Sequence, residues 1–179
     1  MLRLVPLALE HVPLIMSWVN DREVTQYFAA LQADVSEPEE RRFVEALAAS
    51  ADDRAFSIFD GDEYLGQCSV NKIYWPARNG RVFIALRRAA QGRGHGRAAL
   101  ARLMEIAWGE LDLHKLWLIV RRDNHRAQAL YVRLGFEFAG VLRDEYSVGG
   151  RYLDMVRMAA LRPVSQLGPD ASVPGYAKN

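Results

Sequence analysis

The stretch Gln91-Gly92-Arg93-Gly94-His95-Gly96-Arg97-Ala98-Ala99-Leu100 decides the fold, because it joins a glycine loop to the start of a helix. Glycines let backbone N–H groups approach a ligand closely, and the first turn of the helix adds unpaired N–H groups and a positive dipole end. Arg93 and Arg97 can add charge-assisted hydrogen bonds to the same anion. The stretch therefore predicts a phosphate-binding site.

Other phosphate motifs fit this loop less well. A Walker loop is excluded, since no Gly-Lys-Ser/Thr follows the glycines. A dinucleotide-binding loop fits residues 94–99, which follow G-x-G-x-x-A, with Asp123 at the end of the next strand. However, residues 87–93 make too long a link between strand and glycines, and the chain holds one such unit. A dinucleotide site and a purely structural glycine loop stay open as alternatives.

Outward from this loop, hydrophobic periodicity predicts a series of strands. Ala55–Asp60 and Tyr64–Tyr74 flank a turn over residues 60–63, as in a hairpin. Arg81–Leu86 forms a third strand before the loop. Lys115–Arg121 is a nearly continuous apolar run, which is typical of a strand buried on both faces.

Helices and a final strand pair complete the pattern. Ser36 and Glu39 form a capping box, which predicts a helix that continues to about Ala49. Apolar stripes predict two more helices, one after the glycine loop and one after the strand that follows it. Phe136–Arg143 and Tyr152–Leu161 are the last two strands. This order of elements predicts an α/β (α+β) domain with a mixed sheet.

Length and composition indicate an ordinary globular protein. The chain has 179 residues, 50% of them hydrophobic, and a net charge of +1, which excludes disorder as its main state. No apolar stretch reaches the ~20 residues that a membrane span needs, and no signal peptide is indicated. We expect a single domain over residues 1–161 and a loosely held tail over 162–179, where Pro, Gly, Ser and Asp dominate.

The cysteine and histidine content argues against a metal site. Cys68 is the only cysteine, so the chain has no disulfide framework and no thiolate cluster. The four histidines lack the spacing of metal ligands. We expect a small buried apolar role for Cys68, no bound metal, and a reducing, cytoplasmic location.

Charge is unevenly distributed along the chain. Residues 1–60 carry 11 acidic and 5 basic side chains, whereas residues 61–179 carry 11 acidic and 18 basic ones. An anionic ligand is therefore expected at the second part and a cationic one at the first, unless both are simply solvated faces. A nucleic-acid partner would need a larger basic excess, and none is expected.

The chain resembles the GCN5-related N-acetyltransferases (GNAT family) over about residues 1–161. The family signature Q/R-x-x-G-x-G/A matches residues 91–96 at every fixed position. Further matches follow in the family's order and spacing at Asn124, Ala127, Tyr131 and Leu134-Gly135-Phe136. Residues 140–144 (Gly-Val-Leu-Arg-Asp) and Asp154 resemble the subgroup of ribosomal-protein N-terminal, amino-sugar and polyamine acetyltransferases.

The resemblance implies a mostly antiparallel central sheet with helices on both faces and a splayed central strand pair. Acetyl-CoA would lie in the splay, with its pantetheine arm along the strand over residues 81–86 and its pyrophosphate on the amides of residues 93–97. The cofactor contacts implied in this way are Ile84, Leu86, Arg88, Gln91, Gly92, Arg93, Gly94, His95, Gly96, Arg97, Asn124, Ala127 and Tyr131.

Tyr131 is the candidate proton donor. The resemblance places it beside the thioester sulfur, and a tyrosine with an ordinary pKa of about 10 keeps its proton at neutral pH. A backbone N–H of the splayed strand can serve as oxyanion donor. The alternatives are a core aromatic role for Tyr131, on one stripe with Leu130 and Leu134, and a strand-ending role for Asn124.

Several charged side chains are candidates for the general base, and each is equally suited to an ordinary surface position. The candidates are Asp21, Glu23, Glu63, Asp144, Glu145 and His125. Asp144 and Glu145 are preferred because they begin the link between the last two strands, which borders the acceptor site in similar enzymes. A chain of waters can also replace a side-chain base.

We therefore expect an acetyl-CoA-dependent N-acetyltransferase that works by direct attack in a ternary complex. The alternatives are a catalytically silent acetyl-CoA-binding regulatory module, against which Tyr131 argues, and a dinucleotide-binding protein. A small-molecule amine, such as an amino sugar or a polyamine, and a protein N-terminus all fit as acceptor. Dimers are common among similar enzymes, but the residues leave the oligomeric state, including a homodimer, open. No membrane partner is expected.

Overall fold

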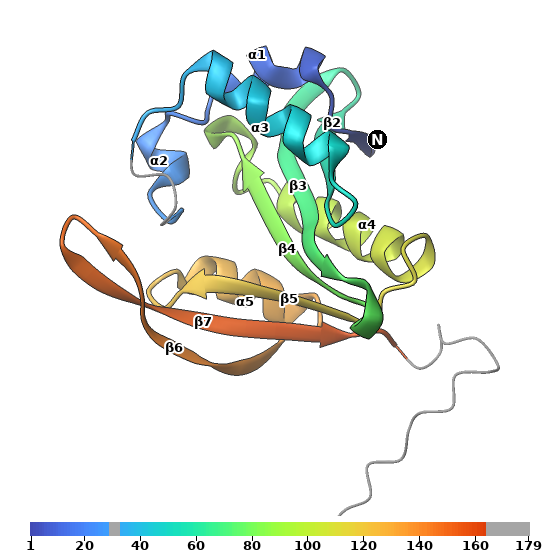
Figure 1. Cartoon of the computed structure of the whole chain (residues 1–179), viewed down its shortest axis with the longest axis vertical. Coiled ribbons are helices and arrows are strands. Elements are labelled where there is room, and N and C mark those ends of the chain that lie inside the picture. Colours follow the sequence, from blue (N-terminus) through green and yellow to red (C-terminus); the bar gives the residue numbers. More distant parts are fainter. Residues whose placement is uncertain (29–32, 164–179) are drawn as a thin grey trace, which may run out of the picture.

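The computed structural model describes residues 1–28 and 33–163, which form one seven-stranded sheet with helices on both faces (Figure 1). The strands are β1 (Leu2–Pro6), β2 (Arg54–Asp60), β3 (Glu63–Tyr74), β4 (Asn79–Leu86), β5 (Lys115–Arg121), β6 (Glu137–Val148) and β7 (Arg151–Leu161). The helices are α1 (Val12–Met16), α2 (Arg22–Thr25), α3 (Glu37–Ala49), α4 (His95–Gly109) and α5 (His125–Arg133). None of these helices is long and apolar enough to cross a membrane. Of the predicted tail over 162–179, residues 164–179 lie outside the described residues.

The sheet is mixed and mostly antiparallel, as predicted. Its strand order is β1-β2-β3-β4-β5-β7-β6, and every neighbouring pair runs antiparallel except β4 and β5. The predicted hairpin corresponds to β2 and β3. A parallel pair needs a long crossover, and α4 supplies it by carrying the chain from the end of β4 back to the start of β5.

The parallel pair separates after three residues. Residues 79–81 of β4 pair with residues 115–117 of β5, and the described residues show no further pairing between these strands. Beyond this point, which we call the fork, the two strands diverge toward their carboxyl ends and form the V seen in Figure 1. The expected splayed central strand pair is confirmed. The inner edge of β4 beyond the fork therefore has backbone N–H and C=O groups that no strand pairs.

Each face of the sheet has its own hydrophobic core. On one face, α4 and α5 pack against the strands, and Cys68, Leu100 and Leu118 are buried there. On the other face, α1 and α3 pack on β2, β3 and β4 and bury residues such as Ile15 and Val44. Cys68 is 1% exposed, and burial raises the pKa of its thiol. Its predicted role as a small buried apolar residue is confirmed.

β5 is buried on one face rather than on both, so that expectation was wrong. Leu116, Leu118 and Val120 are buried against α4 and α5, but the alternate residues are half-buried. Among them, the Trp117 ring lies between two guanidinium groups, with Cζ of Arg157 4.2 Å and Cζ of Arg81 6.0 Å from its centre. The helices α1 and α3 pack on β2, β3 and β4, so they do not reach this side of β5 (Figure 1).

The last two strands are longer than predicted, which moves Asp144 and Glu145 into the middle of β6. The link between β6 and β7 is Gly149-Gly150, where both residues have positive φ. The pairing of β6 with β7 shifts between Leu142 and Tyr146, and Asp144 has φ of 50°. This bulge lets the strand continue through polar residues that sequence patterning assigns to a turn.

α3 begins at the predicted capping box. The backbone N–H and the hydroxyl of Ser36 both donate to Glu39 Oε2, at 2.8 and 2.5 Å. These bonds lower the pKa of Glu39, and they satisfy the backbone N–H of Ser36 at the start of the helix. One residue further on, Glu40 is buried, and its Oε1 has no hydrogen-bond partner within residues 1–28 and 33–163. Desolvation consequently raises the pKa of Glu40.

Candidate active site

The glycine loop and the first turn of α4 form an open cradle of backbone N–H groups. Gly92 and Gly94 have φ of 78° and 85°, which favours glycine over residues with a Cβ. Gly94 is the N-cap of α4 and offers no side chain to cap the first turn. Gln91 Nε2 donates to the carbonyl oxygen of Leu86 at 3.0 Å, so the cradle is fixed to the end of β4. This arrangement suits a phosphate group.

The cradle lies where β4, α4 and α5 meet. A Cβ added at Gly96 would lie 3.5 Å from Leu86 Cδ1 and 3.6 Å from Leu130 Cδ2, which is ordinary van der Waals contact, so Gly96 lies directly against side chains of β4 and α5. A Cβ at Gly92 would lie 3.5 Å from Nη2 of Arg126. Arg126, in the first turn of α5, is a cationic neighbour of the cradle that sequence analysis did not single out.

The remaining predicted residues of the cradle come from the glycine loop and the first turn of α4. His95 is the first residue of that helix and is half-buried, with Nδ1 3.2 Å from the carbonyl oxygen of Ala90. Arg93 and Arg97 are exposed. Arg93 and His95 both lower the pKa of Asp60, whose principal partner is the N-terminal amine of Met1. The arginines are therefore available to an anion from solvent.

α5 carries three of the predicted residues. Asn124 caps the helix, since its Oδ1 accepts from the backbone N–H of Ala127 at 3.1 Å. Ala127 and Tyr131 pack against the core on the α4 side. The ring centroids of Tyr131 and Phe136 are 5.8 Å apart. Burial raises the pKa of Tyr131 to about 12, so the hydroxyl keeps its proton at neutral pH. Tyr131 can therefore donate a proton and cannot act as a base there.

The two predicted contacts on β4 lie on one face of the sheet. Ile84 and Leu86, beyond the fork, pack on the α4 and α5 side. Phe83 packs on the opposite side with the α1 and α3 core. Arg88 follows β4, and its guanidinium binds Glu23 at 2.8 Å, so its side chain points to α2 rather than into the cradle.

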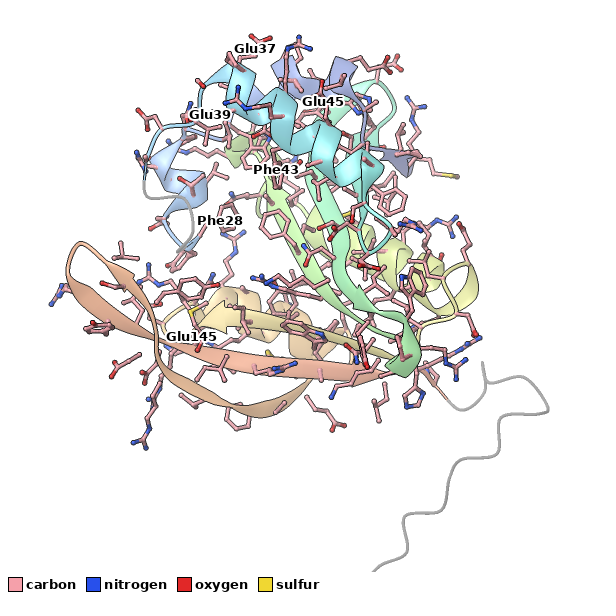
Figure 2. All side chains as sticks on the ribbon, in the orientation of Figure 1. Phe28, Glu37, Glu39, Phe43, Glu45 and Glu145 are labelled. Atoms are coloured by element: carbon pink, nitrogen blue, oxygen red, sulfur yellow. The ribbon has the colours of Figure 1, made fainter. Side chains whose placement is uncertain are left out.

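The structure does not bring the candidate bases together. Asp21 caps α2, and Glu63 pairs with Arg87. Asp144 and Glu145 are exposed on β6, and neither carboxylate has a hydrogen-bond or ion-pair partner among the described residues. Figure 2 shows Glu145 on the arm that β6 and β7 form and Phe28 beyond the end of α2, both near the open end of the V.

An open pocket of about 520 Å³ lies at the carboxyl end of β5. Its lining residues come from the turn before α5 and the start of β7: Arg121, Arg122, Asp123, His125, Tyr152, Leu153 and Asp154. Both carboxylates are neutralised by arginine, Asp123 by Arg121 and Asp154 by Arg122. No cluster of His, Cys, Asp or Glu that could hold a metal occurs in residues 1–28 and 33–163.

Comparison with known proteins places this geometry in a family. The family model described as an acetyltransferase (GNAT) domain matches residues 1–137. The spermidine N(1)-acetyltransferase of Vibrio cholerae is 28% identical over 144 residues, 80% of this chain and 83% of that protein. The N-alpha-acetyltransferase RimI of Mycobacterium tuberculosis is 44% identical over 62 residues, 35% of this chain and 37% of that protein.

A solved structure extends the likeness over the whole fold. The crystal structure of spermidine N-acetyltransferase from Vibrio cholerae in complex with CoA and spermine superimposes with a TM-score of 0.84 at 27% identity. The match covers 89% of this chain and 95% of that one. With its split parallel strand pair and its glycine cradle at the start of α4, the chain belongs to the GNAT acetyltransferase family and is an acetyl-CoA-dependent N-acetyltransferase.

Proposed function

We propose that the chain transfers the acetyl group of acetyl-CoA to a polyamine-like primary amine. The observation that carries this proposal is the likeness, over most of the chain, to a spermidine acetyltransferase whose crystal structure contains spermine. The charge distribution supports it, since the first 60 residues have more than twice as many acidic as basic side chains. Among them are Glu37, Glu39 and Glu45, which Figure 2 shows on α3. An acidic field of this kind attracts a polycation.

We infer that acetyl-CoA lies in the V, with its phosphates on the cradle. The fit rests on three features of this chain: uncapped N–H groups at the start of α4, glycines that leave the cradle open, and an unpaired backbone edge on β4. The residues proposed to hold it are those named from the resemblance, from Ile84 to Tyr131, with Arg88 acting through its backbone because its side chain binds Glu23, and with the addition of Arg126. When bound, acetyl-CoA supplies an activated thioester.

Within this arrangement the chain's own groups position the amine and move protons. A backbone N–H on the unpaired edge of β4 stabilises negative charge that develops on the carbonyl oxygen. Tyr131 gives its hydroxyl proton to the sulfur as the C–S bond breaks, because its raised pKa keeps the proton in place until then, and the proton that the nitrogen loses on becoming an amide restores the hydroxyl. Asp144 or Glu145, directly or through water, takes the proton that the ammonium group of the acceptor must lose before attack.

The choice between these two carboxylates is tested by Asp144→Asn and Glu145→Gln. We expect the variant that removes the base to lose about 10²- to 10⁴-fold in kcat/KM for the amine, with the loss smaller at high pH where free amine accumulates. Glu137→Gln, an exposed glutamate at the other end of β6, is the control. Wild-type rates in both variants would overturn the assignment of the base to Asp144 or Glu145 and leave the other candidate side chains or a water chain.

The acceptor itself is tested by release of free thiol from acetyl-CoA across a panel of amines. The panel contains spermidine, spermine, an amino sugar and peptides with free N-termini at equal concentrations. We expect the polyamines to give the highest kcat/KM. A preference for a peptide or a sugar by tenfold or more would overturn the polyamine assignment without touching the acetyltransferase activity.

A protein N-terminus is the second candidate acceptor. The observation that favours it is the match to the N-alpha-acetyltransferase RimI, which has the higher identity but covers 35% of this chain. The peptides in the panel test this possibility directly. We place it second because the polyamine acetyltransferase resembles the chain over a much longer stretch.

A further inference from the structure

One short segment contacts both limbs of the V, and we call it the α2 bridge (residues 22–28). On the β4 limb it is held at two points. Arg88 Nη1 lies 2.8 Å from Glu23 Oε1, and the Phe28 and Phe83 rings lie 5.4 Å apart between centroids. Figure 1 shows α2 at the open end of the V.

On the β5 limb, the side-chain contacts to the bridge within the described part of the chain come from Arg121. Arg121 donates from Nε and Nη2 to the two carboxylate oxygens of Asp123, at 3.0 and 2.5 Å. Its Nη1 donates to the carbonyl oxygen of Gln26 at 2.8 Å, and its Cζ lies 5.1 Å from the centre of the Tyr27 ring. The Asp123 carboxylate fixes the plane of the guanidinium. Nη1 then donates to the backbone of the bridge, and one face of the guanidinium lies toward the Tyr27 ring. A lysine cannot make this set of contacts.

The bridge and Tyr131 lie on opposite faces of the sheet. Phe83, on which the bridge packs, belongs to the core under α1 and α3, whereas Tyr131 packs on the α4 and α5 side. If the thioester lies in the V, Tyr131 covers it from one face, and an amine must approach from the other, past the bridge. This step rests on the proposed location of acetyl-CoA.

We propose that Arg121 is a positioning residue for the acceptor, which holds the α2 bridge against the end of β5 and thereby sets the approach path of the amine. Without the guanidinium, the bridge keeps its ties to β4 and loses those to β5. The V itself remains, since the fork, the cradle and α5 do not depend on this contact. Loss of Arg121 therefore changes how the amine binds and leaves the acetyl-CoA site intact.

The experiment compares Arg121→Met and Arg121→Lys with Arg122→Met as the matched control. Arg122 is the next residue, but it pairs with Asp154 of β7 instead of the bridge. The first readout needs no turnover: amide hydrogen exchange over residues 22–28. Removing a charged hydrogen bond should speed exchange there about tenfold or more in Arg121→Met. Exchange should rise less in Arg121→Lys and stay at the wild-type level in Arg122→Met.

The second readout separates the two substrates. In Arg121→Met, KM for the best amine should rise about tenfold, because loss of one charged hydrogen bond changes an equilibrium constant by at least about that factor. KM for acetyl-CoA should stay within about twofold of the wild-type value. Unchanged exchange over residues 22–28, or an equal rise of both KM values, would overturn the positioning role. If no polyamine is acetylated, KM is measured with the best amine of the panel instead. The absence of polyamine acetylation then counts against the polyamine assignment and not against the positioning role of Arg121.

Discussion

At the scale of single residues, the Tyr131 hydroxyl is the group on which the proposed proton transfer depends. Tyr131→Phe keeps the ring that packs on Phe136 and deletes only the oxygen. We expect the single-turnover rate at saturating acetyl-CoA to fall by roughly 10²- to 10⁴-fold, the usual contribution of a positioned acid. Single-turnover rates are needed because slow product release would mask a damaged chemical step.

Binding and stability distinguish this role from a merely structural one. Acetyl-CoA affinity should be unchanged in Tyr131→Phe, and the free energy of unfolding should change by no more than about 1 kcal/mol. A Phe variant with the wild-type single-turnover rate would remove Tyr131 from the mechanism and leave it as a core aromatic.

Glu40 is a buried carboxyl whose pKa is raised by desolvation, and it should make stability depend on pH. Between its ordinary value of 4.5 and its raised value, the folded state binds more protons than the unfolded state. This contribution is fully present below the unfolded pKa and is lost as pH rises through the folded pKa. Glu40→Gln should therefore be more stable than wild type at pH 7, by about 1 kcal/mol or 2–4 °C in Tm at this chain length.

A neighbouring glutamate provides the control for this prediction. Glu45 lies on the same helix but is exposed (Figure 2), so Glu45→Gln should leave Tm unchanged between pH 4 and 8. The gain of Glu40→Gln should shrink as pH falls toward 4, where the wild-type carboxyl is protonated. A gain that stays constant over this pH range would show that the carboxyl charge is not its cause.

At the scale of elements, the start of α4 combines a backbone requirement with a binding role. Gly94 has a positive φ that residues with a Cβ rarely adopt, although a Cβ there would meet open space. Gly94→Val should weaken acetyl-CoA binding at least about tenfold, because the side chain would stand where the phosphate must approach the amides. Calorimetric titration measures the affinity.

The other end of the same helix offers a matched glycine. Gly109 ends α4, lacks a positive φ and has open space around its Cβ position. Gly109→Ala should bind acetyl-CoA like wild type and gain up to about 1 kcal/mol from helix propensity. If Gly94→Val stays folded and also binds normally, the phosphates lie elsewhere.

Local signals in the sequence predict some elements well and others poorly. The capping box of Ser36 and the glycine loop were predictable because the groups that interact are within a few residues of one another. The burial of β5 was not, since it depends on whether a second helical layer reaches that part of the sheet. The length of β6 was missed because the bulge at Asp144 lets polar residues continue the strand.

The same difference applies within the site. Tyr131, Asn124 and the cradle residues are proposed from a family motif that is contiguous or nearly so. Arg121 and Arg126 had no such signal. The Arg121 hydrogen bond to Gln26 joins residues that are 95 positions apart, and a lone arginine at the end of a strand is usually solvated. Only the folded chain shows that its guanidinium is shared between two elements.

At the scale of the whole molecule, the separation of charge along the chain should affect catalysis through the salt concentration. The acidic part, residues 1–60, includes α2 and α3 on the face from which the amine is expected to approach. Interactions between exposed charges are screened beyond about 10 Å at 0.1 M salt. KM for a polyamine should therefore rise between 0.05 and 0.5 M salt, while kcat at saturation changes little. A KM for the amine that is independent of salt would contradict this expectation.

The Trp117 ring, held between Arg81 and Arg157 at the fork, gives the molecule an internal optical reporter. Indole emission responds to nearby charge and to solvent, and Trp117 is half-buried at the point from which β4 and β5 diverge. A ligand or substitution that moves β4 and β5 apart or together changes the distances from the Trp117 ring to the guanidinium groups of Arg81 and Arg157. The difference in fluorescence between wild type and Trp117→Phe thus isolates a spectroscopic signal for the opening of the V, without any added dye.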